Sequence, residues 1–166
     1  MIALKTSVVA AAMFGVAGGA GAEEFACTHD QCMDKMNIVL RKSAPQFVAA
    51  KQSCADEGGG RRCRYRSNSG PGINMMSKAG SPKVQAIVIV DRRGMTPAGG
   101  IYIDAIMQAF DTSLDASGRK QFYNNLLGDF ASSFEKGGIM QKSSGKLRYV
   151  LSTDEKFTII GVSHAK

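Results

Sequence analysis

The sequence predicts an α+β fold, in which a mostly antiparallel sheet of about five to six strands carries helices on one face. Residues 84–90 form the most apolar run outside the first twenty-odd residues, and most of them are β-branched. Such a run is typical of a central strand that is buried on both faces. Further strand-like segments precede and follow it, and a helical block separates the two groups. This grouping favours helices packed on one face of an antiparallel sheet.

The first 22 residues have the three parts of a secretory signal peptide. Lys5 supplies a positive charge, a small apolar stretch follows, and Ala20-Gly21-Ala22 forms a cleavage site ahead of two glutamates. A membrane helix is the alternative, but the glycines and the short apolar core argue against it. We therefore expect an exported protein, located in a bacterial periplasm or secreted. Its mature chain, residues 23–166, would form a single α+β domain without a transmembrane segment.

The four cysteines all lie in the first third of the mature chain: Cys27, Cys32, Cys54 and Cys63. An even number of cysteines in an exported protein indicates disulfides, and three pairings are possible here. We favour the two local pairs, Cys27 with Cys32 and Cys54 with Cys63. A zinc site is the alternative, but the spacings are longer than the about two to four intervening residues usual for zinc.

A helix is predicted over residues 28–43, where Thr28 and Gln31 form a capping box. Pro45 ends this helix, and a disulfide at Cys27 would tie its start. Strands are predicted over residues 47–54 and 62–68, joined by a turn that contains three consecutive glycines. A short strand over residues 73–78 then leads to the central strand.

The helical block follows the central strand. Thr96-Pro97 has the form of a helix start, but Gly99 and Gly100 weaken that start, so the firm helix spans residues 101–110. A third helix carries Phe122, Leu126 and Phe130 on an apolar stripe, and Gly137-Gly138 closes it. The remaining segments, 139–142, 147–151 and 157–162, are predicted strands, the last two forming a hairpin.

No pattern of catalytic residues stands out in this sequence. His29 is adjacent to Asp30, but neighbouring residues of a helix point in different directions, and His164 lies near the C-terminus. No Gly-x-Ser-x-Gly motif marks a nucleophile, and the cysteines are expected to be oxidised. Two distant histidines and widely spaced aspartates predict no metal site, and we expect no cofactor.

Basic residues form the best candidate site. The formal net charge of +7 becomes +6 once Lys5 is removed with the signal peptide. The candidate partner-binding residues are Arg61, Arg62, Arg64, Arg66, Arg92 and Arg93, with Lys78 and Lys83 between them. Arginine at alternate positions of one strand forms a stripe that suits carboxylate or phosphate partners. The alternative is a solvated edge strand, charged to prevent pairing with another sheet.

These observations favour a non-enzymatic binding protein of the bacterial envelope, similar in role to an inhibitor or immunity protein. Its partner would be an acidic protein or another anionic component of the envelope, and nucleic acid is not expected in that compartment. A small exported hydrolase with an unrecognised active site is the second hypothesis. A structural accessory protein of an envelope complex is the third.

Overall fold

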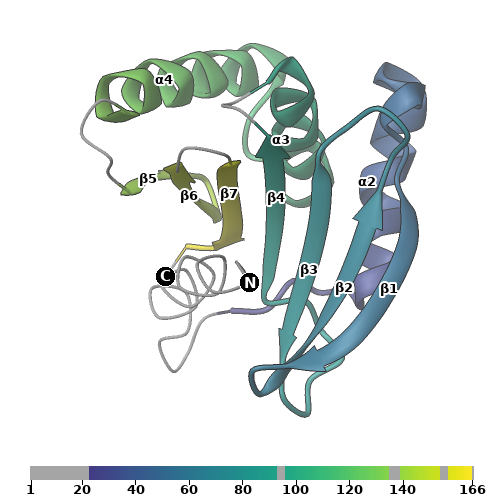
Figure 1. Cartoon of the computed structure of the whole chain (residues 1–166). Helices are drawn as coiled ribbons and strands as arrows, with labels where there is room; N and C mark the ends of the chain where they lie inside the picture. The colour runs from purple at the N-terminus through teal and green to yellow at the C-terminus, as the bar shows by residue number, and fades with distance from the viewer. Residues whose placement is uncertain (1–22, 93–95, 135–138, 154–156, 166) are drawn as a thin grey trace, which may run out of the picture.

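The computed structural model of the chain describes residues 23–92, 96–134, 139–153 and 157–165. The signal peptide expected over residues 1–22 lies outside this part. The described part contains an antiparallel sheet of seven strands in the order β1-β2-β3-β4-β7-β6-β5 (Figure 1). The α+β prediction is therefore confirmed, with more strands than expected. The strands are β1 (Ala50–Glu57), β2 (Gly60–Arg66), β3 (Gly72–Lys78), β4 (Ala86–Arg92), β5 (Ile139–Ser144), β6 (Leu147–Thr153) and β7 (Phe157–His164).

The N-terminal helix begins where the capping box predicts. Helix α2 (His29–Ser43) has Thr28 as its N-cap, and the Thr28 amide donates to Gln31 Oε1 at 3.0 Å. The Gln31 amide donates in return to the Thr28 hydroxyl. A short 3₁₀ helix (Pro45–Phe47) follows, so β1 begins later than the predicted residue 47.

Helix α3 (Pro97–Phe110) begins four residues earlier than predicted. Thr96 caps it, because its hydroxyl oxygen accepts a hydrogen bond from the Gly99 amide. Gly100 is required by packing rather than by a turn: a Cβ added there would lie 2.2 Å from the hydroxyl of Tyr123. Tyr123 belongs to α4 (Ala116–Phe134), so the glycine allows α3 and α4 to approach closely.

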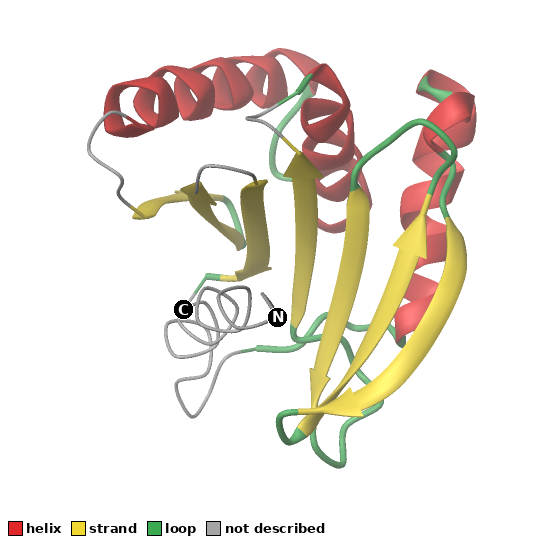
Figure 2. Cartoon of the chain, viewed as in Figure 1, coloured by secondary structure: helices red, strands yellow, loops and turns green. Residues whose placement is uncertain are grey.

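The helices pack on one face of the sheet, as predicted. Figure 2 shows α2 and α3 behind strands β1–β4 and α4 across the top of the β5–β7 end. Tyr65 of β2 donates a hydrogen bond to Asp30 of α2, and Phe122 of α4 packs on Tyr149 of β6. The register of the strands places Tyr65 and Tyr149 on the same face, with Ile89 between them at the centre of the core.

Strand β4 lies fourth among the seven strands, at the centre of the sheet, as its apolar run predicts. Its two faces differ, however. Ile87 and Ile89 are fully buried beneath the helices, whereas Val88 and Val90 on the other face are only partly buried. The expectation that this strand is buried on both faces is therefore wrong, because all the helices of the described part pack on one face of the sheet.

Both disulfides have the predicted local pairing. Cys27 and Cys32 are joined at the start of α2, and Cys54 and Cys63 are directly opposite each other on β1 and β2. Two disulfides indicate an oxidising, exported environment. Within the described ranges, no helix combines the length and the apolarity needed to span a membrane.

Candidate functional site

The arginines of β2 divide between the two faces of the sheet. Side chains alternate along a strand, so Arg61 shares the helix-covered side with Cys63 and Tyr65. Arg62, Arg64 and Arg66 share the opposite face, which no helix of the described part covers. Of the four predicted arginines whose side chains the structure describes, three therefore share one open face, and Arg61 is separate from them.

Apolar side chains from the neighbouring strands continue this face. Met76 and Asn74 of β3 pair with Arg62 and Arg64, and Val88 of β4 pairs with Asn74. Residues that are directly opposite in an antiparallel pair lie on the same side of the sheet. We call the resulting surface the basic face. Its residues are Arg62, Arg64, Arg66, Asn74, Met76, Val88, Val90 and Ile159.

Glu57 neutralises part of the basic face. Its carboxylate forms an ion pair with Arg62, whose Nη2 atom is 2.6 Å from Oε1, and a longer one of 3.4 Å with Arg64. The side chains of Arg64 and Glu57 are 53% and 41% exposed, so water and salt weaken this pair. The sequence pattern does not identify Glu57, because its position depends on the hairpin register that pairs it with Gly60.

Arg66 is exposed and has no ion pair among the described residues. It lines a hollow of about 640 Å³ at the end of the sheet, together with Val90 of the basic face. Phe47, Pro71 and Phe157 make much of this hollow apolar. Asp91 also lines it, but the Thr96 hydroxyl donates a hydrogen bond of 2.5 Å to the Asp91 carboxylate. The hollow thus offers one free guanidinium beside apolar walls.

The structure describes the other predicted basic residues only in part. The side chain of Arg92 and all of Arg93 lie outside the part that the structure describes, and the register places Arg92 opposite Phe157. Lys78 forms an ion pair of 3.3 Å with Glu24. Lys83 lies in an isolated bridge with Thr28, away from the basic face.

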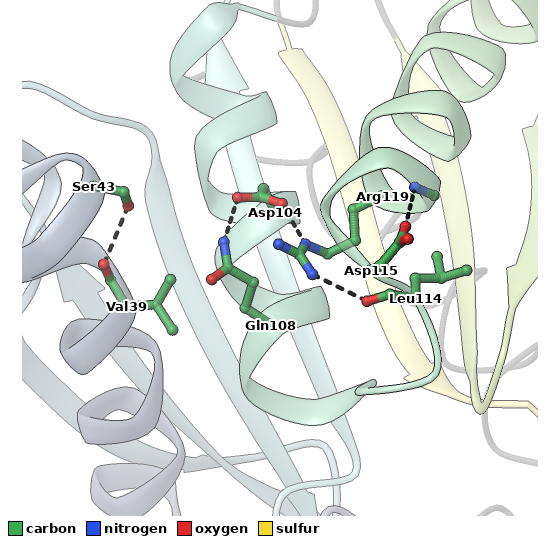
Figure 3. A network of polar contacts seen from close by, with 8 residues as sticks. Val39, Ser43, Asp104, Gln108, Leu114, Asp115 and Arg119 are labelled. Carbon is green, nitrogen blue, oxygen red and sulfur yellow. Dashed lines mark hydrogen bonds and ion pairs between the residues drawn. The ribbon is translucent and has the colours of Figure 1, made fainter.

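Arg119 of α4 shows how a structural arginine differs from those of the basic face. Figure 3 shows its guanidinium between Asp104 of α3 and the Leu114 carbonyl, with Gln108 on the other side of Asp104. Nε donates to the Asp104 carboxylate and Nη1 to the Leu114 oxygen, both at 3.0 Å. These contacts engage the Arg119 guanidinium in joining α3 to α4, so few of its hydrogen-bond donors are left for a partner.

The side chains of His29 and Asp30 make separate contacts. Lys51 and Tyr65 donate to the Asp30 carboxylate at 2.6 and 2.7 Å, and these hydrogen bonds lower the pKa of Asp30. His29 is buried, and burial lowers its pKa below the ordinary 6.5. Its Nε2 atom has no hydrogen-bond partner among the described residues. Ser81, which lines a second hollow together with His29, donates instead to Glu24.

His164 lies apart from His29, and its ring packs at 4.7 Å from the ring of Phe25. No group of three histidine, cysteine or acidic side chains suited to a metal occurs in the described part of the chain.

The fold and this surface define an α+β protein with two disulfides and a basic sheet face that no helix of the described part covers. No protein-family model matches the chain, and no curated protein or solved structure matches it either.

Proposed function

We propose that this protein is a non-enzymatic binding protein of the bacterial envelope that holds an acidic partner protein on the basic face. One observation carries the proposal. Arg66 projects without an ion pair at the rim of an apolar hollow, in line with Arg64 and Arg62 on the same strand. A carboxylate that follows an apolar side chain in the partner would fit this arrangement.

The position of β2 in the sheet supports a binding role for its arginines. Charges on an edge strand serve to prevent unwanted pairing with another sheet. Strand β2, however, is paired with β1 on one side and with β3 on the other. The edge-strand alternative for these arginines is therefore wrong, and their charges need another explanation.

The composition of the basic face also fits a protein partner. Arginine and methionine are enriched at protein interfaces, and Met76 lies directly beside Arg62. The guanidinium fork binds a carboxylate through two parallel hydrogen bonds, which fixes its orientation as well as its charge. An acidic protein segment with interspersed apolar residues can use both parts of this surface.

The test is a binding titration with a labelled peptide that alternates glutamate and leucine. We expect the double variant Arg64→Gln with Arg66→Gln to bind at least about tenfold more weakly than wild type, since charge pairs across an interface are coupled. Arg61→Gln is the matched control, because Arg61 belongs to the same strand but to the opposite face. Equal losses in the double variant and in Arg61→Gln would overturn the proposal.

A variant that is expected to strengthen binding provides a second test. Glu57→Gln releases Arg62 and Arg64 from their shared counter-ion, so the peptide should bind about two- to fivefold more tightly, as expected for an exposed ion pair. Asp56→Asn removes the same charge from the neighbouring residue, which points to the opposite face, and should leave affinity unchanged. Binding to anionic lipid vesicles but not to the peptide would instead indicate a lipid partner.

A further inference from the structure

The Cys54–Cys63 disulfide lies in the wall of a hollow of about 840 Å³, distinct from the hollow beside Arg66. This hollow lies between the start of α2, the β1–β2 hairpin and the turn between β3 and β4, and both Cys54 and Cys63 line it. Cys54 is partly exposed, whereas only 2% of Cys63 is exposed. Cys54 is therefore the more accessible half of this disulfide for a thiol that enters the hollow.

The Cys27–Cys32 disulfide, in contrast, is buried. Cys27 and Cys32 are 3% and 0% exposed and belong to the hydrophobic core. Thiol–disulfide exchange requires direct approach of a thiolate to a sulfur atom, so access separates the two disulfides. The same molecule thus contains one shielded and one accessible disulfide.

The strand that holds Cys54 leaves room for this approach. Strand β1 is the last strand of the described sheet, and every residue of β1 except Cys54 is exposed. The β1–β2 ladder also holds the two strands together without the disulfide. In addition, Asn37 of α2 makes two hydrogen bonds to the Ala49 backbone, at 2.9 and 3.0 Å, which fix the start of β1. Opening the disulfide would therefore leave the surrounding structure in place.

Charge in the hollow does not oppose an incoming thiolate. The charged side chains that line it are Lys51, Arg61, Lys78, Asp30, Asp56 and Glu57. Lys51 is paired with Asp30, and Glu57 with Arg62. Arg61 is directly opposite Asp56, so positive and negative charges balance in the hollow.

We propose that Cys54–Cys63 is a thiol-exchange site whose substrate is a dithiol, either a small molecule or a Cys pair of a redox protein. One thiolate of the dithiol attacks Cys54 Sγ, forming a mixed disulfide and releasing Cys63, which takes up a proton. The second thiol of the dithiol loses its proton and attacks the sulfur of the first, releasing Cys54 as a thiol. The dithiol is oxidised to a disulfide, and Cys54 and Cys63 are reduced by two electrons.

The test is a stepwise reduction of the wild-type protein under native conditions, with dithiothreitol as the dithiol. Free thiols are alkylated and located by mass spectrometry. We expect Cys54 and Cys63 to become reduced at least about tenfold below the reductant concentration needed for Cys27 and Cys32. Far-UV circular dichroism should not change at that step. Prior opening of Cys27–Cys32, or joint opening accompanied by loss of structure, would overturn the proposal.

A second measurement identifies the sulfur that is attacked. In Cys63→Ser the remaining Cys54 thiol should react quickly with a disulfide reagent such as 5,5′-dithiobis(2-nitrobenzoate). In Cys54→Ser the buried Cys63 thiol should react at least about tenfold more slowly. Similar rates in two folded variants would show that Cys54 is not the point of entry.

Discussion

At the scale of single residues, His29 is a buried histidine that also lines the hollow beside the β1–β2 hairpin. His29 is 6% exposed, and burial opposes the protonated form of its imidazole. The positive charges of Arg61 and Lys51 lower its pKa further, while the Arg61 backbone and Asp30 act in the opposite direction. The net result is a histidine that stays neutral in the folded protein at pH values where the unfolded chain would protonate it.

This lowered pKa predicts a pH dependence of stability. Below the ordinary pKa of 6.5 the unfolded chain binds a proton that folded His29 rejects, so the free energy of unfolding decreases as the pH falls. The decrease ends when the pH reaches the lower pKa of the folded state. Urea unfolding from about pH 7.5 to about pH 5.5, a window set by the ordinary histidine pKa, should show a steeper loss in wild type than in His29→Gln. His164 is present in both proteins and serves as an internal control. Parallel curves would show that burial does not shift the pKa of His29.

At the scale of elements, the contact between α3 and α4 depends on a missing side chain. A Cβ at Gly100 would lie 2.2 Å from the Tyr123 hydroxyl oxygen and 2.4 Å from the ring carbon that carries it. Neither distance is possible without movement of the tyrosine ring or of a helix. The partly buried ring of Tyr123 also packs against the core, so its displacement should be costly.

The substitution Gly100→Ala should therefore lower the free energy of unfolding by about 1–3 kcal/mol, as expected for overpacking. In a Tyr123→Ala background the same change meets no ring, and alanine should then stabilise the helix by up to about 1 kcal/mol relative to glycine. Denaturant unfolding of the four proteins in this cycle measures both effects. A loss of equal size in both backgrounds would mean that Tyr123 is not the cause.

Gly100 also shows where prediction from sequence stops. The alternation of β2 predicts the row of Arg62, Arg64 and Arg66, because it depends on neighbouring residues alone. The capping box predicts the start of α2 for the same reason. Thr96-Pro97 signals the start of α3, but the two glycines obscure it, because the reason for Gly100 is its contact with Tyr123, a residue of another helix. The pairing of Glu57 with two arginines likewise depends on strand register, which the turn geometry decides: Gly58 and Gly59 both have positive φ.

At the scale of the whole molecule, one core joins the two halves of the sheet. Buried residues of α2, α3 and α4 form a single cluster with those of β2, β3 and β4 and those of β6 and β7. Strand β4 is the link, because it pairs with β3 on one side and with β7 on the other. The disulfides, in contrast, lie only in the N-terminal half. No disulfide ties the C-terminal strands, so their cooperative unfolding depends on pairing with β4 and on packing against the helices.

Ile89 tests this dependence, since it is fully buried at the centre of β4 and directly opposite Ile73 and Ile160. Replacing it with alanine should lower the free energy of unfolding by about 3 kcal/mol through lost burial and the cavity that remains. If residues 23–166 form one domain, amide exchange in β2–β3 and in β6–β7 should accelerate by the same factor under conditions where exchange reports global unfolding. Val39→Ala shortens a partly buried side chain of α2. It should accelerate exchange by a smaller factor than the Ile89 variant does, and by the same factor in both regions. Faster exchange confined to β6–β7 would mean that the disulfide-bonded half folds on its own, and the chain would then consist of two cooperative units that share β4.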